Sequence, residues 1–188
     1  EPGLLPGDRN NYLTAVVIQE TSAGLASVDI ITGELTATEI EAEDLPTILR
    51  GELVRLHPAE ILLPDTTSLN DGLSFSLTRW PAWRFESGRC VDALLRQFQV
   101  GALDGYGLRN LPLATRAAGA IIQYLTETQP AALKLLEGLS TYTLSEFMTL
   151  DAATRRNLEL TETIRSGEVQ GSLLSVLDHT ATPMGKRL

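Results

Sequence analysis

Residues 12–40 read YLTAVVIQETSAGLASVDIITGELTATEI, and this stretch decides the fold class. Tyr12–Ile18 is apolar on both faces, which is typical of a central strand that is covered on both sides. After a Thr-Ser-Ala-Gly turn, Leu25–Ile31 is again apolar and β-branched, and the Thr-Gly pair that follows is a two-residue hairpin signal. In Leu35–Ile40, apolar residues alternate with Thr and Glu, which favours a strand with one solvated face. We therefore expect three sequential antiparallel strands.

Helices and further strands alternate after this stretch. Asp44 is a candidate N-cap for a helix that carries Pro46 in its first turn. Five apolar residues mark the expected buried face of that helix: Leu45, Ile48, Leu49, Leu53 and Leu56. Ala59–Leu63 predicts a buried strand parallel to the first one. The remaining elements expected are a strand over residues 73–77 and a helix over residues 87–98 capped by Ser87. This order indicates an α/β fold whose mixed sheet, three antiparallel strands and then parallel ones, is flanked by helices.

Composition sets limits on function. The chain has 188 residues, of which 43% are hydrophobic and 21% charged, so it can bury a core. There are 24 acidic against 15 basic residues, and the net charge of −9 predicts a poor stand-alone nucleic-acid binder, because phosphate neutralisation needs a basic surface. The longest uncharged runs are about ten residues, too short for a transmembrane helix of roughly 20. With one cysteine, Cys90, an internal disulfide and a cysteine-cluster metal site are excluded, and a reducing compartment fits.

The second part of the chain has helical periodicity. Leu113–Leu125 carries the small residues Ala114, Ala118 and Gly119, which permit close approach to a neighbouring backbone. The further elements expected are a short helix over Leu133–Leu139, an extended segment over Thr141–Leu150, a helix from Asp151 through Thr161, a loop at Gly167 and Gly171, and a helix opened by Ser172. Because the chain starts without Met and stops where a helix begins, we expect a fragment of a longer protein.

Two acidic residues are candidates for a metal-dependent nuclease. Asp29 lies at the end of a central strand, and Glu34 follows it after a hairpin. A site of the ribonuclease H type needs several carboxylates around Mg²⁺, and the first strand supplies none. A position of Asp29 that caps the hairpin, or is half exposed, is therefore favoured over a metal site.

The other reactive side chains favour structural roles. His57 lies at a helix C-terminus, where a cation favours the dipole, and His179 has no partners at metal-ligand spacing. Cys90 has only Arg89 as a basic neighbour, which favours packing or idle exposure over a nucleophile. The Gly-Lys pair at residues 185–186 lacks the P-loop pattern. The residues alone predict no catalytic constellation and a function in interaction or mechanical coupling.

Two blocks stand out near the C-terminus: residues 150–161, LDAATRRNLELT, and residues 172–188, SLLSVLDHTATPMGKRL. Together they resemble the MutS family of DNA mismatch-repair proteins. The matching residues are Asp151, Thr154, Arg156, Asn157, Leu158 and Glu159 in the first block, and Asp178, Thr180, Thr182, Met184, Gly185 and Arg187 in the second.

The resemblance implies a place within a larger protein. Residues 1–130 look like the connector domain, of ribonuclease H-like fold, and residues 131–188 look like the truncated N-terminal part of the α-helical core and lever domain. The implied role is non-catalytic coupling of mismatched-DNA binding to an ABC-type ATPase. By the same resemblance, ATP and Mg²⁺ belong to the parent protein, which is a cytoplasmic homodimer without membrane contact, and no cofactor or metal belongs to this chain.

The resemblance also implies a surface for a MutL-like protein. We place it on the helix over residues 87–98, with Arg89, Asp92, Ala93 and Arg96. Some family members show paired glutamines where this chain has Asp92-Ala93, and a plain solvated helix face is the competing interpretation. The rival functional class is a ribonuclease H-like metal-dependent nuclease that uses Asp29 and Glu34.

Overall fold

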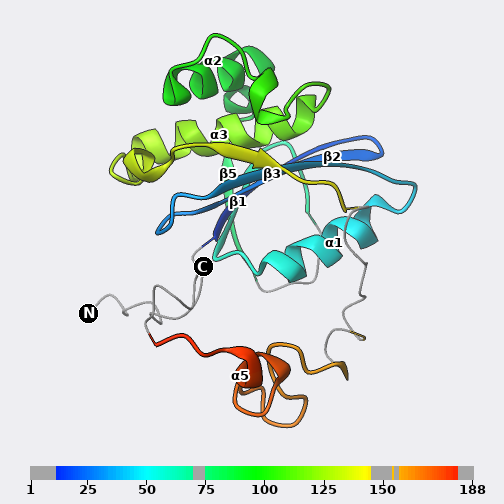
Figure 1. Cartoon of the computed structure of the whole chain (residues 1–188). Coiled ribbons are helices and arrows are strands. Elements are labelled where there is room, and N and C mark those ends of the chain that lie inside the picture. Colours follow the sequence, from blue (N-terminus) through cyan, green and yellow to red (C-terminus); the bar gives the residue numbers. More distant parts are fainter. Residues whose placement is uncertain (1–11, 70–74, 145–153, 155–156, 182–188) are drawn as a thin grey trace. The chain divides into compact units, whose positions relative to one another are not determined.

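The computed structural model describes residues 12–69, 75–144, 154 and 157–181. The chain divides into two compact units, one formed by residues Asn11–Phe147 and the other by Glu1–Asn10 with Met148–Leu188. The first unit contains a sheet with helices on both of its faces, and the second contains the short helix α5 (Figure 1).

A six-stranded mixed sheet with the order β5-β4-β1-β2-β3-β6 forms the centre of the first unit (Figure 1). Its strands are β1 (Tyr12–Gln19), β2 (Ser22–Asp29), β3 (Leu35–Glu41), β4 (Glu60–Pro64), β5 (Ser76–Trp80) and β6 (Leu139–Thr141). The strands β1, β2 and β3 are antiparallel, whereas β4 runs parallel to β1, β5 to β4, and β6 to β3. The predicted mixed α/β sheet, three antiparallel strands and then parallel ones, is confirmed.

The turn between β1 and β2 is shorter than expected. Gln19 pairs with Ser22, so the turn consists of Glu20 and Thr21, and Glu20 has a positive φ of 52°. The predicted Thr-Ser-Ala-Gly turn is wrong because Gly24 continues the strand. A Cβ atom on Gly24 would overlap the backbone of Leu113, so the glycine is needed for close approach rather than for a turn.

The loop between β2 and β3 is longer than expected. Val28 pairs with Leu35, and the chain turns through residues 30–33 rather than through a two-residue hairpin. The N–H of Gly33, whose φ is 76°, donates to the Asp29 carbonyl oxygen at 2.8 Å. A four-residue loop of this kind places a left-handed residue at its last position, which glycine adopts without strain.

Helix α1 (Leu45–Leu56) covers one face of the sheet. The Asp44 carboxylate accepts from the Thr47 N–H at 3.3 Å, as the predicted N-cap should. Leu45, Leu49 and Leu53 are buried, but Ile48 is 39% exposed, so its predicted place on the buried face is wrong. The helix ends at His57, a left-handed C-cap whose N–H donates to the Leu53 carbonyl oxygen.

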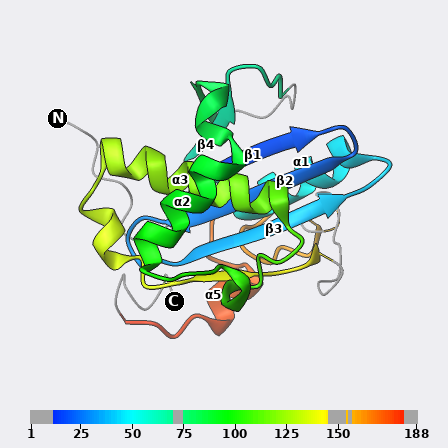
Figure 2. The same ribbon diagram turned by 90° about the horizontal axis from the view of Figure 1, so that it is seen from above.

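Helices α3 (Pro112–Thr128) and α2 (Ser87–Phe98) form two successive layers on the opposite face (Figures 1 and 2). Residues of α3 are buried on its side toward the sheet and on its side toward α2. The first amides of α3 are capped from the sheet, because the Glu39 carboxylate accepts from Leu113 N–H at 2.8 Å and Ala114 N–H at 3.1 Å. A carboxylate at a helix N-terminus satisfies free N–H groups and favours the helix dipole.

The small residues of α3 allow close packing inside this unit, as the sequence predicts. A Cβ atom on Gly119 would overlap the backbone of Cys90 in α2. Glu86 is the N-cap of α2 and makes no side-chain capping bond, so the prediction that Ser87 caps this helix is wrong.

Two predicted elements shift along the sequence. The expected helix over Leu133–Leu139 is in fact the 3₁₀ helix η3 (Ala132–Leu135) followed by strand β6, so that part of the prediction is wrong. The strand expected over residues 73–77 is β5, which begins at Ser76, while residues 70–74 lie outside the described residues. Two further 3₁₀ helices are η1 (Ala82–Phe85) and η2 (Asp104–Tyr106).

The described part of the second unit is mostly turns. The helix predicted through Thr161 ends earlier, since Glu159 has a φ of 46°, and its predicted cap Asp151 lies outside the described residues. Gly167 and Gly171 have positive φ, as a loop there predicts. Helix α5 (Leu173–Leu177) begins after Ser172, whose hydroxyl accepts from the Ser175 N–H at 3.3 Å. Within the described residues, no helix is long and apolar enough to cross a membrane.

Two helix-interior glycines should respond in opposite ways to alanine. Gly119→Ala forces α2 away from α3, so we expect a loss of about 1–3 kcal/mol in the free energy of unfolding. Gly51→Ala in α1 places its methyl group in open space, so we expect a gain of about 0.5–1 kcal/mol from helix propensity. Urea titration of both variants measures this, and a stabilised Gly119→Ala variant would contradict the backbone contact.

Candidate docking groove beside helix α2

Helix α2 turns one face to α3 and the other to solvent. Cys90 and Leu94, four residues apart, are fully buried. Arg89, Asp92 and Arg96 are exposed on the opposite side. The spacing of the charged residues in the sequence predicts this exposed face, because positions three and four apart share one side of a helix.

An open groove of about 830 Å³ runs beside this face, between α2, the second half of α3 and η3. We call it the α2–α3 groove. The four residues predicted for partner binding all line it: Arg89, Asp92, Ala93 and Arg96. The opposite wall carries Gln123, Thr126 and Glu127, and Arg84 lies at one end.

Ion pairs form the rim of the groove. Arg89 Nε lies 3.9 Å from Glu86 Oε2, and Arg96 Nη2 lies 4.0 Å from Asp92 Oδ2. Both pairs are solvent-exposed at the outer distance limit, so each contributes at most about 1 kcal/mol to stability. Because these charges are held loosely, they can exchange their partners for charges on another molecule at little cost.

The floor of the groove is apolar. Ile122 is 3% exposed, and Ala93 and Leu133 are half-buried. The side chain of Gln97 joins α2 to η3, because its amide donates to the Leu133 carbonyl oxygen at 2.8 Å. Protein interfaces often have an apolar centre and a polar rim, so this groove is a candidate docking site.

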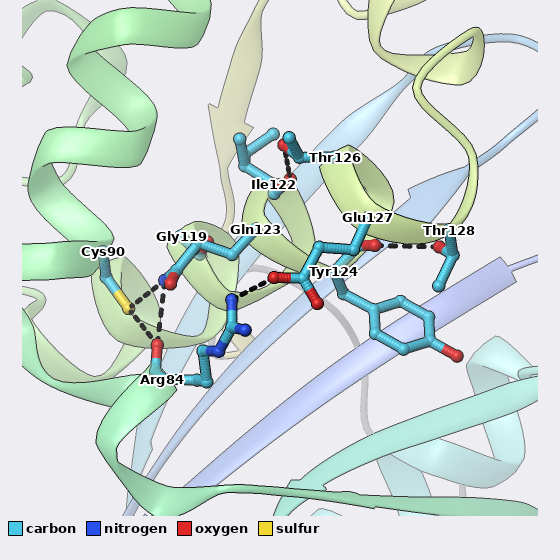
Figure 3. Close-up of polar contacts among 9 residues, drawn as sticks. All are labelled: Arg84, Cys90, Gly119, Ile122, Gln123, Tyr124, Thr126, Glu127 and Thr128. Atoms are coloured by element: carbon cyan, nitrogen blue, oxygen red, sulfur yellow. Dashed lines mark hydrogen bonds and ion pairs between the residues drawn. The ribbon is translucent and has the colours of Figure 1, made fainter.

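Arg84 connects the groove to the aromatic rings of Trp80 and Trp83. Its guanidinium lies 4.7 Å from the Trp80 ring centre and 4.4 Å from that of Trp83, and it forms an ion pair with Glu127 (Figure 3). The Arg89 guanidinium lies 4.7 Å from the same Trp83 ring, which is 45% exposed. The Trp-rich stretch around Arg84 was a signal in the sequence, but its ion-pair partner is 43 residues away.

Cys90 is fully buried beside Gln123, one of the residues that line the groove. Its Sγ donates to the Arg84 carbonyl oxygen at 3.4 Å, and the Gln123 amide donates to the same oxygen at 2.8 Å (Figure 3). Desolvation by burial raises the pKa of the Cys90 thiol to about 12. The prediction that Cys90 has a packing role is confirmed, and the alternative that its thiol is exposed and idle is wrong.

The two candidate metal ligands do not form a site. Asp29 is 1% exposed, and its Oδ1 accepts from the Ile31 N–H at 2.8 Å and the Thr32 N–H at 3.4 Å. Capping of the loop is therefore confirmed, and half-exposure of Asp29 is wrong. Glu34 is exposed, and no group of three or more potential metal ligands occurs among the described residues. The nuclease interpretation is not supported.

The described signature residues of the second unit stabilise turns. Glu159 Oε1 accepts from the Ile164 N–H at 2.7 Å, and Asp178 Oδ1 accepts from the Thr180 N–H at 2.9 Å. The Leu158 N–H donates to the Thr154 carbonyl oxygen at 2.9 Å, next to Asn157. The remaining signature residues lie outside the described residues: Asp151, Arg156, Thr182, Met184, Gly185 and Arg187.

Comparison with known proteins identifies two domains. Residues 11–137 match the family described as MutS domain II, and residues 153–188 match MutS domain III. Three relatives named DNA mismatch repair protein MutS match the whole chain: that of Dehalococcoides mccartyi with 43% identity, that of Trichodesmium erythraeum with 42%, and that of Roseiflexus castenholzii with 40%. The chain spans 22%, 22% and 21% of their respective lengths.

The fold and the two matches define the class: an α/β domain followed by a segment that matches a second domain of the DNA mismatch-repair proteins. The chain belongs to the MutS family.

The loop role of Asp29 predicts how its variants behave. Asp29→Ala removes the acceptor for two loop N–H groups and should lower the free energy of unfolding by about 1 kcal/mol. Asp29→Asn keeps a side-chain oxygen at that place and should lose less than half as much. Thermal unfolding of both variants tests the difference, and an equal loss in both would show that the charge, rather than the acceptor, matters.

Burial of Cys90 predicts slow modification. A pKa raised from 9.0 to about 12 lowers the thiolate fraction at pH 8 about a thousandfold. We expect an aromatic disulfide reagent to label native protein far more slowly than protein in denaturant, at a rate that follows unfolding. Equal labelling rates in the two conditions would contradict the buried position.

Proposed function

We propose that this chain is the connector of a MutS-like mismatch-repair protein, together with the N-terminal part of its core and lever domain. The observation that carries the proposal is the match of residues 11–137 to MutS domain II, which includes α2, α3 and strands β1 to β5. The proposed division is a connector over residues 1–130 and the core and lever domain over residues 131–188.

The proposed fold of the connector is ribonuclease H-like. The supporting feature is the sheet, in which an antiparallel β1-β2-β3 meander is extended on the β1 side by the parallel strands β4 and β5. The proposed connector is not a nuclease, and the capping role of Asp29 supports that reading.

The proposed role is to couple mismatched-DNA binding to the ATPase of the parent protein. A coupling element has to move as a rigid body so that displacement at one end reaches the other. Here the sheet is covered on both faces, and the Glu39 carboxylate joins β3 to the start of α3. In this proposal ATP, Mg²⁺ and DNA bind to other domains, and the parent is a cytoplasmic homodimer.

The α2–α3 groove is the proposed surface for a MutL-like protein. Its support is the combination of an apolar floor with three arginines and three acids at its rim, which suits a polar protein surface with a small apolar centre. Arg89, Asp92, Ala93 and Arg96 are the proposed contact residues.

Charge reversal in the full-length protein tests this surface. Arg89→Glu and Arg96→Glu should each weaken binding of the MutL-like partner on the order of fivefold, which corresponds to about 1 kcal/mol per charge. The matched control is Arg50→Glu, the same substitution at an exposed site on α1, which covers the opposite face of the sheet. Binding to mismatched DNA should be unchanged in all three variants.

Surface-immobilised full-length protein and titrated partner give the affinities. Undiminished binding by both Arg89→Glu and Arg96→Glu would remove the groove as the partner site. Equal weakening by Arg50→Glu would show that net charge, rather than this surface, is responsible.

A further inference from the structure

The chain leaves the sheet of the first unit through a short edge strand. β6 has three residues, which pair in parallel with Leu35, Thr36 and Ala37 of β3. It is the last strand before the chain passes to the second unit, which begins again at Met148. A three-residue parallel edge strand forms few ladder hydrogen bonds and is weakly held by them alone.

A polar cluster around the buried Glu52 carboxylate holds the residue that follows β6. The Tyr142 hydroxyl donates to Glu52 Oε1 on α1 at 2.5 Å. Arg55 donates to both oxygens of the same carboxylate, from Nη2 at 2.5 Å and from Nε at 2.8 Å. The Arg55 guanidinium also lies 5.5 Å from the centre of the Tyr142 ring.

Burial separates this cluster from the ion pairs of the α2–α3 groove. Glu52 is 4% exposed, whereas the rim carboxylates Glu86 and Asp92 are exposed. Desolvation by burial, together with the nearby Glu52 carboxylate, raises the pKa of Tyr142. Without the Tyr142 hydroxyl, Glu52 would keep Arg55 as its partner, so the carboxylate would stay paired while the segment after β6 lost its hydrogen bond to α1.

Strand β3 and the loop after η2 also contact the segment at Thr141 and Tyr142. The Tyr142 N–H donates to the Ala37 carbonyl oxygen at 3.1 Å. Gly107, after η2 and with a φ of 76°, lies so close to Thr141 that a Cβ atom there would overlap its hydroxyl. The outgoing chain is therefore attached to the sheet, to the η2 loop and to α1.

We propose that Glu52, Arg55 and Tyr142 form a clamp that fixes the outgoing chain to α1. Strain from the second unit then enters the first through α1 and its packing on the sheet, and not only through the edge strand β6 and its pairing with β3. The transmitting role of the clamp rests on the proposed coupling function, whereas its attachment of β6 does not.

Hydrogen exchange on the 188-residue chain tests the attachment. Tyr142→Phe removes the hydroxyl and keeps the ring. We expect amide exchange over residues 139–142 to become at least about tenfold faster, as loss of a hydrogen bond to a charged group implies. Exchange in β1 and β2 should stay within a factor of about two, since a local opening leaves the core intact.

The matched control is Tyr106→Phe. The Tyr106 ring stacks on the Phe98 ring, with 4.9 Å between the ring centres. The Tyr106 hydroxyl makes no hydrogen bond to the described residues. This variant should leave exchange over residues 139–142 unchanged. Unchanged exchange in Tyr142→Phe, or equal acceleration throughout the sheet, would overturn the clamp.

The transmitting role is tested in the full-length protein. Tyr142→Phe should lower the stimulation of ATP hydrolysis by mismatched DNA at least about twofold without changing basal hydrolysis, and Tyr106→Phe should not. Unchanged stimulation overturns transmission through the clamp. If mismatched DNA does not stimulate ATP hydrolysis by the unsubstituted protein, the proposed coupling function is contradicted, and so is the transmission that rests on it. The hydrogen-exchange experiment would still decide whether the clamp attaches β6 to α1.

Discussion

The contact of the α3 backbone with both of its neighbours is the constraint on which the first unit depends. Gly24 in β2 leaves room for the start of α3, and Gly119 in α3 leaves room for Cys90 in α2. Interiors are close-packed, so a single added methyl group at either point forces a layer to move. The position of α2, and with it the width of the α2–α3 groove, follows from these two contacts.

The two faces of the sheet carry charge in different ways. Beside α2, arginines and acids pair loosely at the surface, where pairing contributes little and the charges can find other partners. Beside α1, Glu52 is buried and fully engaged by Arg55 and Tyr142, so separating the group is costly. The first arrangement suits reversible recognition, and the second suits a fixed attachment.

Local signals predicted elements well where neighbouring residues determine them. Asp44 before α1 and Ser172 before α5 cap their helices because a short side chain reaches amides three residues ahead. Prediction failed where distant residues decide. The helix expected through Leu139 gives way to β6, because the open edge of β3 offers parallel hydrogen bonds to that segment. The cap predicted at Ser87 failed locally, since Glu86 is the N-cap and Ser87 is already the first helical residue.

Of the candidate site, too, the sequence predicted the part that neighbouring residues determine and missed the part that depends on packing. Helical spacing placed Arg89, Asp92 and Arg96 on one exposed face of α2. The opposite wall of the groove, with Gln123 and Glu127, could not be located, since it depends on how α3 packs against α2. Asp29 was open to both a capping and a metal-binding role in the sequence, and only its burial and its bonds to the loop amides separated them.

The sequence by itself determined the order of strands and α-helices as far as α3, the exposed face of α2 and, through the blocks near the C-terminus, the family. These properties depend on residues close together in the chain, where hydrophobic periodicity and capping act. Only the tertiary structure decided the groove and the clamp at Tyr142, which joins residues 90 positions apart. Contacts of that kind form when whole layers pack, and no local pattern encodes which side chains will then meet.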